Sequence, residues 1–117
     1  MTTVYGLSNC DTCRKARNWL ERFGIQHEFV DYRAQRPSPE TLKQWAQALG
    51  GWEALVNRQS TTWRTLPPAR KTPASEPEWT LLLREHPALV KRPLTITDDG
   101  AVSVGFSDAS FKRRFGR

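Results

Sequence analysis

The sequence predicts an α/β fold that begins with a parallel β-α-β unit and ends with a β-hairpin and a helix. Three observations support this prediction. An apolar run at residues 3–7 precedes an amphipathic helical pattern, and a second strand-like run follows at residues 27–32. A Cys-x-x-Cys pair, Cys10 and Cys13, opens that helical pattern. An Asp-Gly turn separates two short strand-like runs near the end of the chain.

The first helix is predicted from the spacing of its apolar residues. They recur at steps of three and four, which places them on one face of a helix that runs to about residue 23. The members of this stripe are Cys13, Ala16, Leu20 and Phe23. Gly24 ends the helix, and residues 27–32 then have the composition of a strand. The two strands are therefore expected to be parallel, with a right-handed crossover.

A helical insertion is expected over about residues 38–87. Ser38 is an N-cap followed by proline, and a glycine pair ends that helix. Ser75, with Glu78 as a capping box, begins another helix that Pro87 stops. Its buried side is expected to hold Trp79, Leu82 and Leu83. The prolines between residues 67 and 77 are expected to prevent regular structure before that cap.

The chain is predicted to end with a hairpin over residues 94–104 and a short helix. Ser107 or Asp108 caps this helix, which carries two phenylalanines. The order β-α-β, inserted helices, β-hairpin and helix is the thioredoxin arrangement. We therefore predict one thioredoxin-like domain over residues 1–117.

Composition limits where the protein acts and what it binds. Hydrophobic residues make up 38% of the 117, and no apolar run approaches the roughly 20 residues that span a bilayer. Because no signal peptide is recognisable either, we expect a cytoplasmic protein without membrane contact, in a compartment that disfavours static disulfides. The net charge of +6 favours anionic partners such as glutathione, an oxyanion, an acidic protein or nucleic acid.

Cys10 is the predicted nucleophile. Amide groups at a helix start and the basic residues that follow Cys10 stabilise a thiolate, which lowers a thiol pKa from about 8.5 toward neutrality. The alternative is an inert buried cysteine. Cys13 could resolve a mixed disulfide on Cys10 or serve only as a small core residue. Zinc is not expected, because only His27 and His86 remain as nitrogen ligands and neither lies near the cysteines in sequence.

Three separated stretches of the chain resemble the arsenate reductase family of glutaredoxin-like proteins, specifically its Spx/YffB-type branch. These stretches are residues 5–16, 61–66 and 91–94, with Gly105-Phe106-Ser107 after the hairpin. The resemblance implies a thioredoxin-like core with Cys10 as the reactive cysteine and Pro93 as a cis-proline. The substrate-binding residues that it implies are Thr12, Arg14, Arg64, Arg92 and Pro93.

These implied contacts have simpler alternatives. Pro93 could be a trans proline that only begins a strand, and Arg64 and Arg58 could be surface charges. The basic residues of 112–117 are expected to be a solvated helix face. Because the sequence has neither a helix-turn-helix nor an RNA-binding aromatic motif, direct nucleic-acid binding is not expected.

The predicted function is a glutathione-dependent thiol-disulfide oxidoreductase. It holds no bound cofactor or metal and uses glutathione as a co-substrate, with glutathione, a glutaredoxin-type protein or Cys13 resolving the Cys10 intermediate. We expect a monomer. One alternative is an Spx-like redox-sensing transcription regulator that binds the RNA polymerase alpha subunit, and a weaker one is a binding scaffold without chemistry.

Arsenate reduction is a further alternative. The arsenate reductases that the chain resembles carry a third anion-binding arginine after the hairpin, where this chain has Gly105-Phe106-Ser107. A trianion would then have fewer charged donors, each of which contributes on the order of 1.5–3 kcal/mol.

Overall fold

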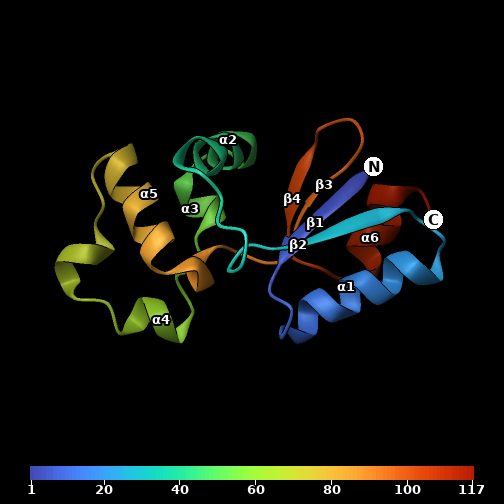
Figure 1. The fold of residues 1–117 in the computed structure, drawn as a ribbon, viewed down its shortest axis with the longest axis horizontal. Coiled ribbons are helices and arrows are strands. Elements are labelled where there is room, and N and C mark those ends of the chain that lie inside the picture. The colour runs from blue at the N-terminus through green and yellow to red at the C-terminus, as the bar shows by residue number, and fades with distance from the viewer. The chain divides into compact units, whose positions relative to one another are not determined.

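A computed structural model describes residues 1–117 (Figure 1). The chain forms two compact units. One unit combines Met1–Tyr32 with Arg92–Arg117, and the other consists of Arg33–Lys91. The second unit contains the predicted helical insertion, and the single-domain organisation stays a prediction.

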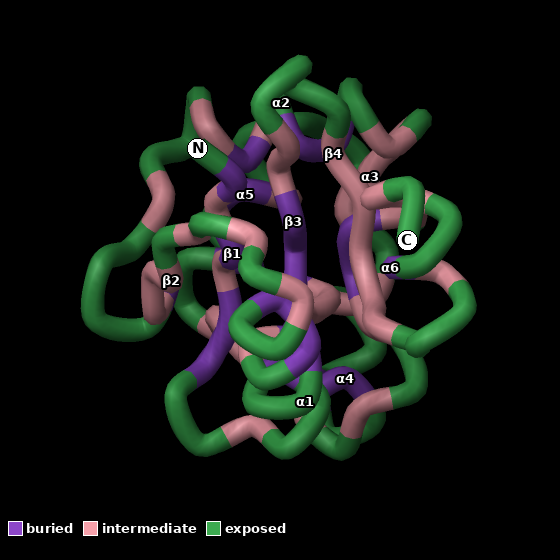
Figure 2. The backbone as a smooth tube through the Cα atoms, turned by 90° about the vertical axis from the view of Figure 1, so that its right-hand side faces the viewer, coloured by how far each residue is buried: buried purple, intermediate pink, exposed green.

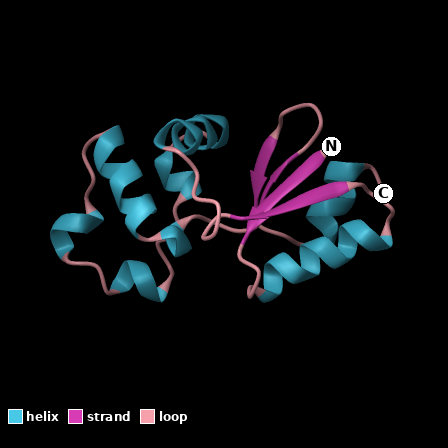
Figure 3. Cartoon of the chain, viewed as in Figure 1, coloured by secondary structure: helices cyan, strands magenta, loops and turns pink.

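The first unit is built on a four-stranded sheet in the order β2-β1-β3-β4. Figure 3 draws its strands in magenta. Strand β1 (Thr2–Gly6) pairs in parallel with β2 (His27–Asp31) and antiparallel with β3 (Leu94–Ile96). Strand β4 (Val102–Val104) completes the predicted hairpin with β3. Helix α1 (Asp11–Arg22) connects the parallel strands, and helix α6 (Asp108–Phe115) ends the chain. The predicted β-α-β start, hairpin and final helix are therefore confirmed.

The core of this unit lies where side chains of α1, α6 and β1 meet, and β1 and β3 both carry buried residues (Figure 2). Trp19 is buried in α1 and packs edge to face on Phe111 of α6, with ring centroids 5.4 Å apart. Its indole N–H also donates to Asp108 Oδ1 at 2.9 Å. The predicted stripe omitted Trp19 and included Phe23, which is only partly buried. The apolar face of α1 is thus wider than the predicted stripe and includes Trp19, because the aromatic residues of α6 cover that side.

The second unit is helical. It contains α2 (Pro39–Leu49), α3 (Trp52–Leu55), α4 (Thr61–Arg64) and α5 (Glu76–Glu85), with 3-10 turns η1 (Pro68–Lys71) and η2 (Pro87–Leu89). Helix α2 packs against α3 and α5. The expectation that prolines exclude regular structure before Ser75 was wrong at η1. Pro68 occupies the first position of that turn, where its fixed φ and missing N–H are tolerated.

Two details of α5 correct the predicted packing and capping. The Ser75 hydroxyl accepts from the Glu78 amide, but the Glu78 carboxylate accepts from the Ala74 amide, so only half of the predicted capping box forms. Trp79 is half-buried and stacks on Trp52, whereas the buried residues of α5 are Thr80, Leu82 and Leu83.

The basic C-terminal helix is not a uniformly solvated face as predicted. The half-buried Arg114 guanidinium donates to the carbonyls of Thr95 at 3.2 Å and Ala101 at 2.6 Å, and to the Thr97 hydroxyl at 3.3 Å. Arg114 therefore joins the end of α6 to the β3–β4 hairpin. In neither unit is there a helix long and apolar enough to cross a bilayer.

Candidate functional site

Cys10 is the N-cap residue of α1. Its extended backbone (φ −96°, ψ 125°) leads into the helix, and its carbonyl accepts the first helical bond, from the Arg14 amide at 3.0 Å. A cysteine at an N-cap has its sulfur beside amide groups that no helical carbonyl occupies. The Cys13 amide favours the charged form of this sulfur, although it does not complete a side-chain cap bond. The chain therefore places a partly exposed thiol at the positive end of the helix dipole.

The loop that carries Cys10 is fixed to the sheet. The Cys10 amide donates to the Leu7 carbonyl at 3.2 Å. The amide and hydroxyl of Ser8 both donate to Asp31 Oδ2, at 3.0 and 2.7 Å. Because Asp31 is the last residue of β2, these bonds hold the cysteine loop at the carboxyl end of the parallel strand pair.

The sheet topology brings Arg92 and Pro93 to the same place. Strand β3 runs antiparallel to β1, with Leu94 opposite Tyr5, so the segment just before β3 lies beside the carboxyl end of β1. The Arg92–Pro93 peptide bond is cis, as the family resemblance implied. The Arg92 side chain hydrogen-bonds to the Cys10 sulfur.

The pKa of Cys10 is lowered from its ordinary value. Burial acts in the opposite direction, but the Cys13 amide, the Arg92 side chain and the Arg92 charge favour the thiolate. Cys10 therefore has the electrostatic surroundings of a nucleophilic cysteine.

Cys13 has the opposite character. It is buried, and burial raises its pKa to about 11, with a further rise from the neighbouring Cys10. Its sulfur lies where a side chain on Gly6 would be, since an ideal Cβ on Gly6 would lie 2.5 Å from Cys13 Sγ. The two cysteines thus differ in exposure and in acidity.

Tyr32 belongs to this cluster, although no sequence motif singled it out. It directly follows β2, and its side chain is fully buried at 0% exposure. It hydrogen-bonds to Arg92, and burial raises its pKa to about 12 against the lowering influence of Arg92. One feature of the sequence could have indicated it. Tyr32 ends the predicted strand at residues 27–32, and that strand was expected to pair with the strand just before the cysteine loop.

The remaining predicted residues are more exposed. Thr12 is exposed in the first turn of α1, and Arg14 forms an exposed ion pair with Asp11 at 2.9 Å. Arg64 lies in α4 of the second unit, where its guanidinium donates to the Gln59 carbonyl at 2.9 Å. Arg58, in the same unit, approaches Glu53 at 3.9 Å.

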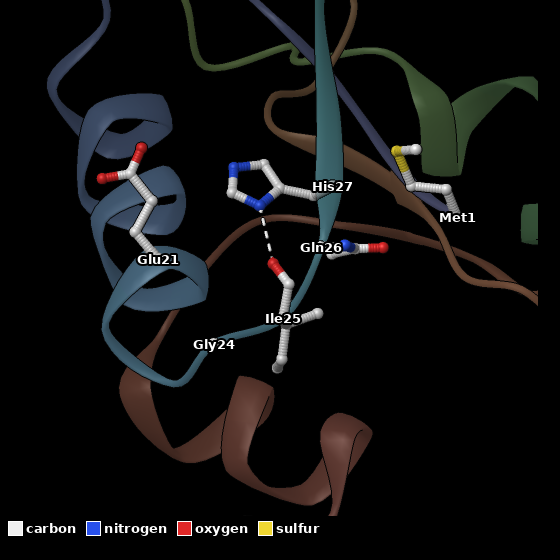
Figure 4. A pocket seen from close by; sticks show the side chains of 6 residues that line it. All are labelled: Met1, Glu21, Gly24, Ile25, Gln26 and His27. Atoms are coloured by element: carbon white, nitrogen blue, oxygen red, sulfur yellow. Dashed lines mark hydrogen bonds between the residues drawn. The ribbon is translucent and has the colours of Figure 1, made fainter.

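A surface hollow of the first unit, drawn in Figure 4, has none of the cluster residues in its lining. Its lining consists of Met1, Glu21, Gly24, Ile25, Gln26 and His27. The His27 Nδ1 lies 2.9 Å from the Ile25 carbonyl oxygen. Because this hollow lies at the amino ends of β1 and β2, it is at the opposite end of the parallel pair from Cys10. Groups of three or more potential metal ligands are absent from the structure.

The sheet order, the helices and the Cys-x-x-Cys pair at the first helix define a thioredoxin-fold protein. The model of the ArsC family matches residues 5–113, so the chain belongs to the ArsC family. It is 40% identical to an uncharacterized protein of Haemophilus influenzae, over 98% of this chain and 99% of that one. It is also 29% identical to the global transcriptional regulator Spx of Bacillus subtilis, over 97% of this chain and 86% of that protein.

Solved structures agree with this assignment. A YffB protein has a TM-score of 0.84 at 33% identity and covers 97% of both chains. An arsenate reductase (ArsC) related protein from Brucella melitensis has a TM-score of 0.77 at 38% identity, covering 99% of this chain and 95% of that one. A glutaredoxin from Methanosarcina mazei, with a TM-score of 0.50 at 18% identity, covers 99% of this chain and 78% of that one and shares the fold alone. The predicted family and fold are therefore confirmed.

Proposed function

We propose that this protein is a glutathione-dependent thiol-disulfide oxidoreductase with Cys10 as its nucleophile. The observation that carries the proposal is the difference between the two thiols. Cys10 is partly exposed at a helix start with a lowered pKa, whereas Cys13 is buried with a pKa raised to about 11. Such a pair suits one thiol for attack and the other for resolution.

The first step is attack of the Cys10 thiolate on one sulfur of a disulfide. The Cys10–sulfur bond forms, the disulfide bond breaks, and the other half leaves as a thiolate that takes up a proton. Arg92 lies within hydrogen-bonding reach of the Cys10 sulfur, so it is placed to receive an anionic group of the substrate beside that sulfur. Glutathione has carboxylates that suit this cation.

The charge on Cys10 controls when Cys13 reacts. The Cys10 sulfur contributes to the raised pKa of Cys13, after burial, so that influence disappears once Cys10 is in a neutral mixed disulfide. Cys13 then loses its proton more readily and attacks the Cys10 sulfur, which forms the Cys10–Cys13 disulfide and releases the bound thiol. Two glutathione molecules restore both thiols and leave as glutathione disulfide.

A turnover assay tests this proposal. The substrate is a mixed disulfide of glutathione and a small thiol, with glutathione, glutathione reductase and NADPH to follow the reaction. We expect turnover by the wild type and by Cys13→Ser, because glutathione itself can resolve Cys10, and none by Cys10→Ser. Equal turnover by Cys10→Ser and the wild type would overturn the proposal.

A second candidate function is supported by the 29% identity to Spx over nearly the whole chain. In this alternative the same cysteine pair is a redox switch on a protein that binds the RNA polymerase alpha subunit. Pull-down with purified alpha subunit, using reduced and oxidised protein, tests it. Saturable binding that changes with oxidation would favour the regulator, and absence of binding together with thiol turnover would exclude it.

Arsenate is a poor match to the cysteine cluster. The Gly105 amide donates to the Pro93 carbonyl at 2.9 Å, Phe106 packs on Phe111 and Ser107 caps α6, so this stretch adds no cationic side chain beside Pro93. We expect arsenate-dependent glutathione oxidation to stay at the rate without protein. Turnover at ordinary enzymatic rates would contradict the preference for a thiol substrate.

A further inference from the structure

We propose that Tyr32 is a positioning residue that holds the Arg92 guanidinium against the Cys10 sulfur. The proposal rests on the proposed function in taking Cys10 as the nucleophile. It assigns to a buried phenol a part in the reaction that neither its sequence context nor the family membership of the chain indicates.

The backbone places Tyr32 at the cysteine end of the sheet. The Tyr32 amide donates to the Gly6 carbonyl at 3.0 Å, directly beyond the last pair of the β1–β2 ladder. Gly6 in turn lies against the Cys13 sulfur. Tyr32 is therefore adjacent to the strand end from which the cysteine loop begins.

The Tyr32 hydroxyl is buried and therefore requires a hydrogen-bond partner within the protein. The residue has 0% exposure, and a phenol hydroxyl removed from water finds a hydrogen-bond partner in the protein. Arg92 hydrogen-bonds to this side chain. Because a guanidinium has only donors, the Tyr32 oxygen is the acceptor of that bond.

Two partners orient Arg92 better than one. Its side chain hydrogen-bonds both to Tyr32 and to Cys10. A guanidinium is a rigid, planar fork, so a second anchor limits rotation about the first bond and keeps an N–H directed at the sulfur. Without Tyr32, Arg92 would retain its charge but lose this constraint, and the thiolate would lose part of its stabilisation.

The test is the pH dependence of Cys10 alkylation by iodoacetamide, with the modified residue identified by peptide mapping. The charged or titratable groups around Cys10 are Arg92, Cys13 and Tyr32 itself, and Cys13→Ala leaves Cys10 as the single thiol. In that background, Tyr32→Phe retains the buried ring and removes only the hydroxyl. We expect the alkylation midpoint to rise by about half a pH unit or more, the size of effect that loss of a hydrogen bond to a charged form can have.

A double variant tests whether Tyr32 affects Cys10 by way of Arg92. Arg92→Gln alone should raise the midpoint at least as far as Tyr32→Phe, and adding Tyr32→Phe to Arg92→Gln should change it no further. Tyr5→Phe, the same change at the other tyrosine of the chain, is the matched control and should leave the midpoint unaltered. An unchanged midpoint in folded Tyr32→Phe, or a shift that persists without Arg92, would overturn the proposal.

A second measurement does not depend on how Tyr32→Phe folds. Tyr5→Phe leaves one tyrosine, so the Cζ NMR resonance of Tyr32 is assigned directly. We expect it to shift as Cys10 titrates, and to shift less in Arg92→Gln, where only the direct effect of the Cys10 charge on the phenol remains. If the Tyr32 Cζ resonance does not shift with the titration of Cys10 while Arg92 is present, the proposed connection between Tyr32 and Cys10 is wrong. If Cys10 of the wild type is alkylated with the pH midpoint of an ordinary cysteine, the proposed function is wrong as well. If the midpoint is lowered but does not change in Tyr32→Phe, only the positioning role of Tyr32 is wrong.

Discussion

The sulfur of Cys13 occupies the space beside Gly6 that a larger residue would need, with 2.5 Å between Cys13 Sγ and an ideal Cβ on Gly6. The Phe29 ring lies 3.3 Å from the same position. Gly6 is in an ordinary strand conformation, so close approach and not backbone geometry requires glycine here.

Gly6→Ala should therefore destabilise the protein by about 1–3 kcal/mol, the usual cost of forcing an extra methyl into a packed interior. Urea unfolding measures this change. The matched experiment places Gly6→Ala in a Cys13→Ala background, where the sulfur is absent and the cost should be smaller. An equal cost in both backgrounds would show that Cys13 is not the source of the crowding.

Thr95→Val should raise stability by about 1 kcal/mol, because it removes a buried hydroxyl without a partner. Thr95 has 0% exposure in β3, and its Oγ1 makes no hydrogen bond. Thr80→Val is the control, since the Thr80 hydroxyl donates to the Pro77 carbonyl at 3.1 Å and its removal should destabilise α5. Thermal unfolding compares the two variants, and a loss of stability in Thr95→Val would show that its hydroxyl has a partner.

Arg114→Met should destabilise the first unit by about 1–3 kcal/mol, because it leaves acceptors of the hairpin without their charged donor. Arg113→Met removes the same charge from an exposed neighbour and should change stability little. Amide hydrogen exchange locates the effect. Faster exchange in β3 and β4 of the Arg114 variant alone is expected, and equal effects of both variants would indicate a general charge effect.

Stability should fall as the pH rises from 9.0 to about 11, because Cys13 keeps its proton in the folded state after an unfolded chain has lost it. Tyr32, with its pKa raised to about 12, extends this loss to higher pH. Cys10 has the opposite effect, because its pKa is lowered in the folded state. The stability that it contributes is fully present above pH 9.0. Urea unfolding on both sides of this interval should show a smaller loss for Cys13→Ala than for the wild type, and identical losses would contradict the assignment.

Local patterns were sufficient to predict much of the fold. Caps at Ser38, Ser75 and Ser107, apolar spacing in α1 and the Asp-Gly turn each act over a few residues, and the structure has an element at each place. Arg92 and Pro93 were not indicated by a local pattern, and the resemblance to the arsenate reductase family is what implied their place in the site.

Residues whose role depends on distant partners were missed. Arg114 depends on carbonyls of the hairpin and has no local sequence signal. Tyr32 depends on Arg92, and its place at a strand end does not by itself identify that partner. Trp19 was omitted because the width of the apolar face of α1 depends on the aromatic residues of α6. The turn at Pro68–Lys71 was missed because the prolines between residues 67 and 77 were treated only as residues that interrupt regular structure. Proline is also well suited to begin a helical turn, as Pro39 does in α2.

Trapping with oxidised glutathione separates the roles of the two cysteines, in which Cys10 attacks the disulfide and Cys13 resolves the intermediate. Reduced wild type and Cys13→Ser are incubated with oxidised glutathione, and intact mass and peptide mapping identify each product. We expect a Cys10–Cys13 disulfide in the wild type and a glutathione adduct on Cys10 in Cys13→Ser. Adducts on Cys10 in both proteins would contradict the resolving role of Cys13, and no modification of either would contradict the nucleophilic role of Cys10.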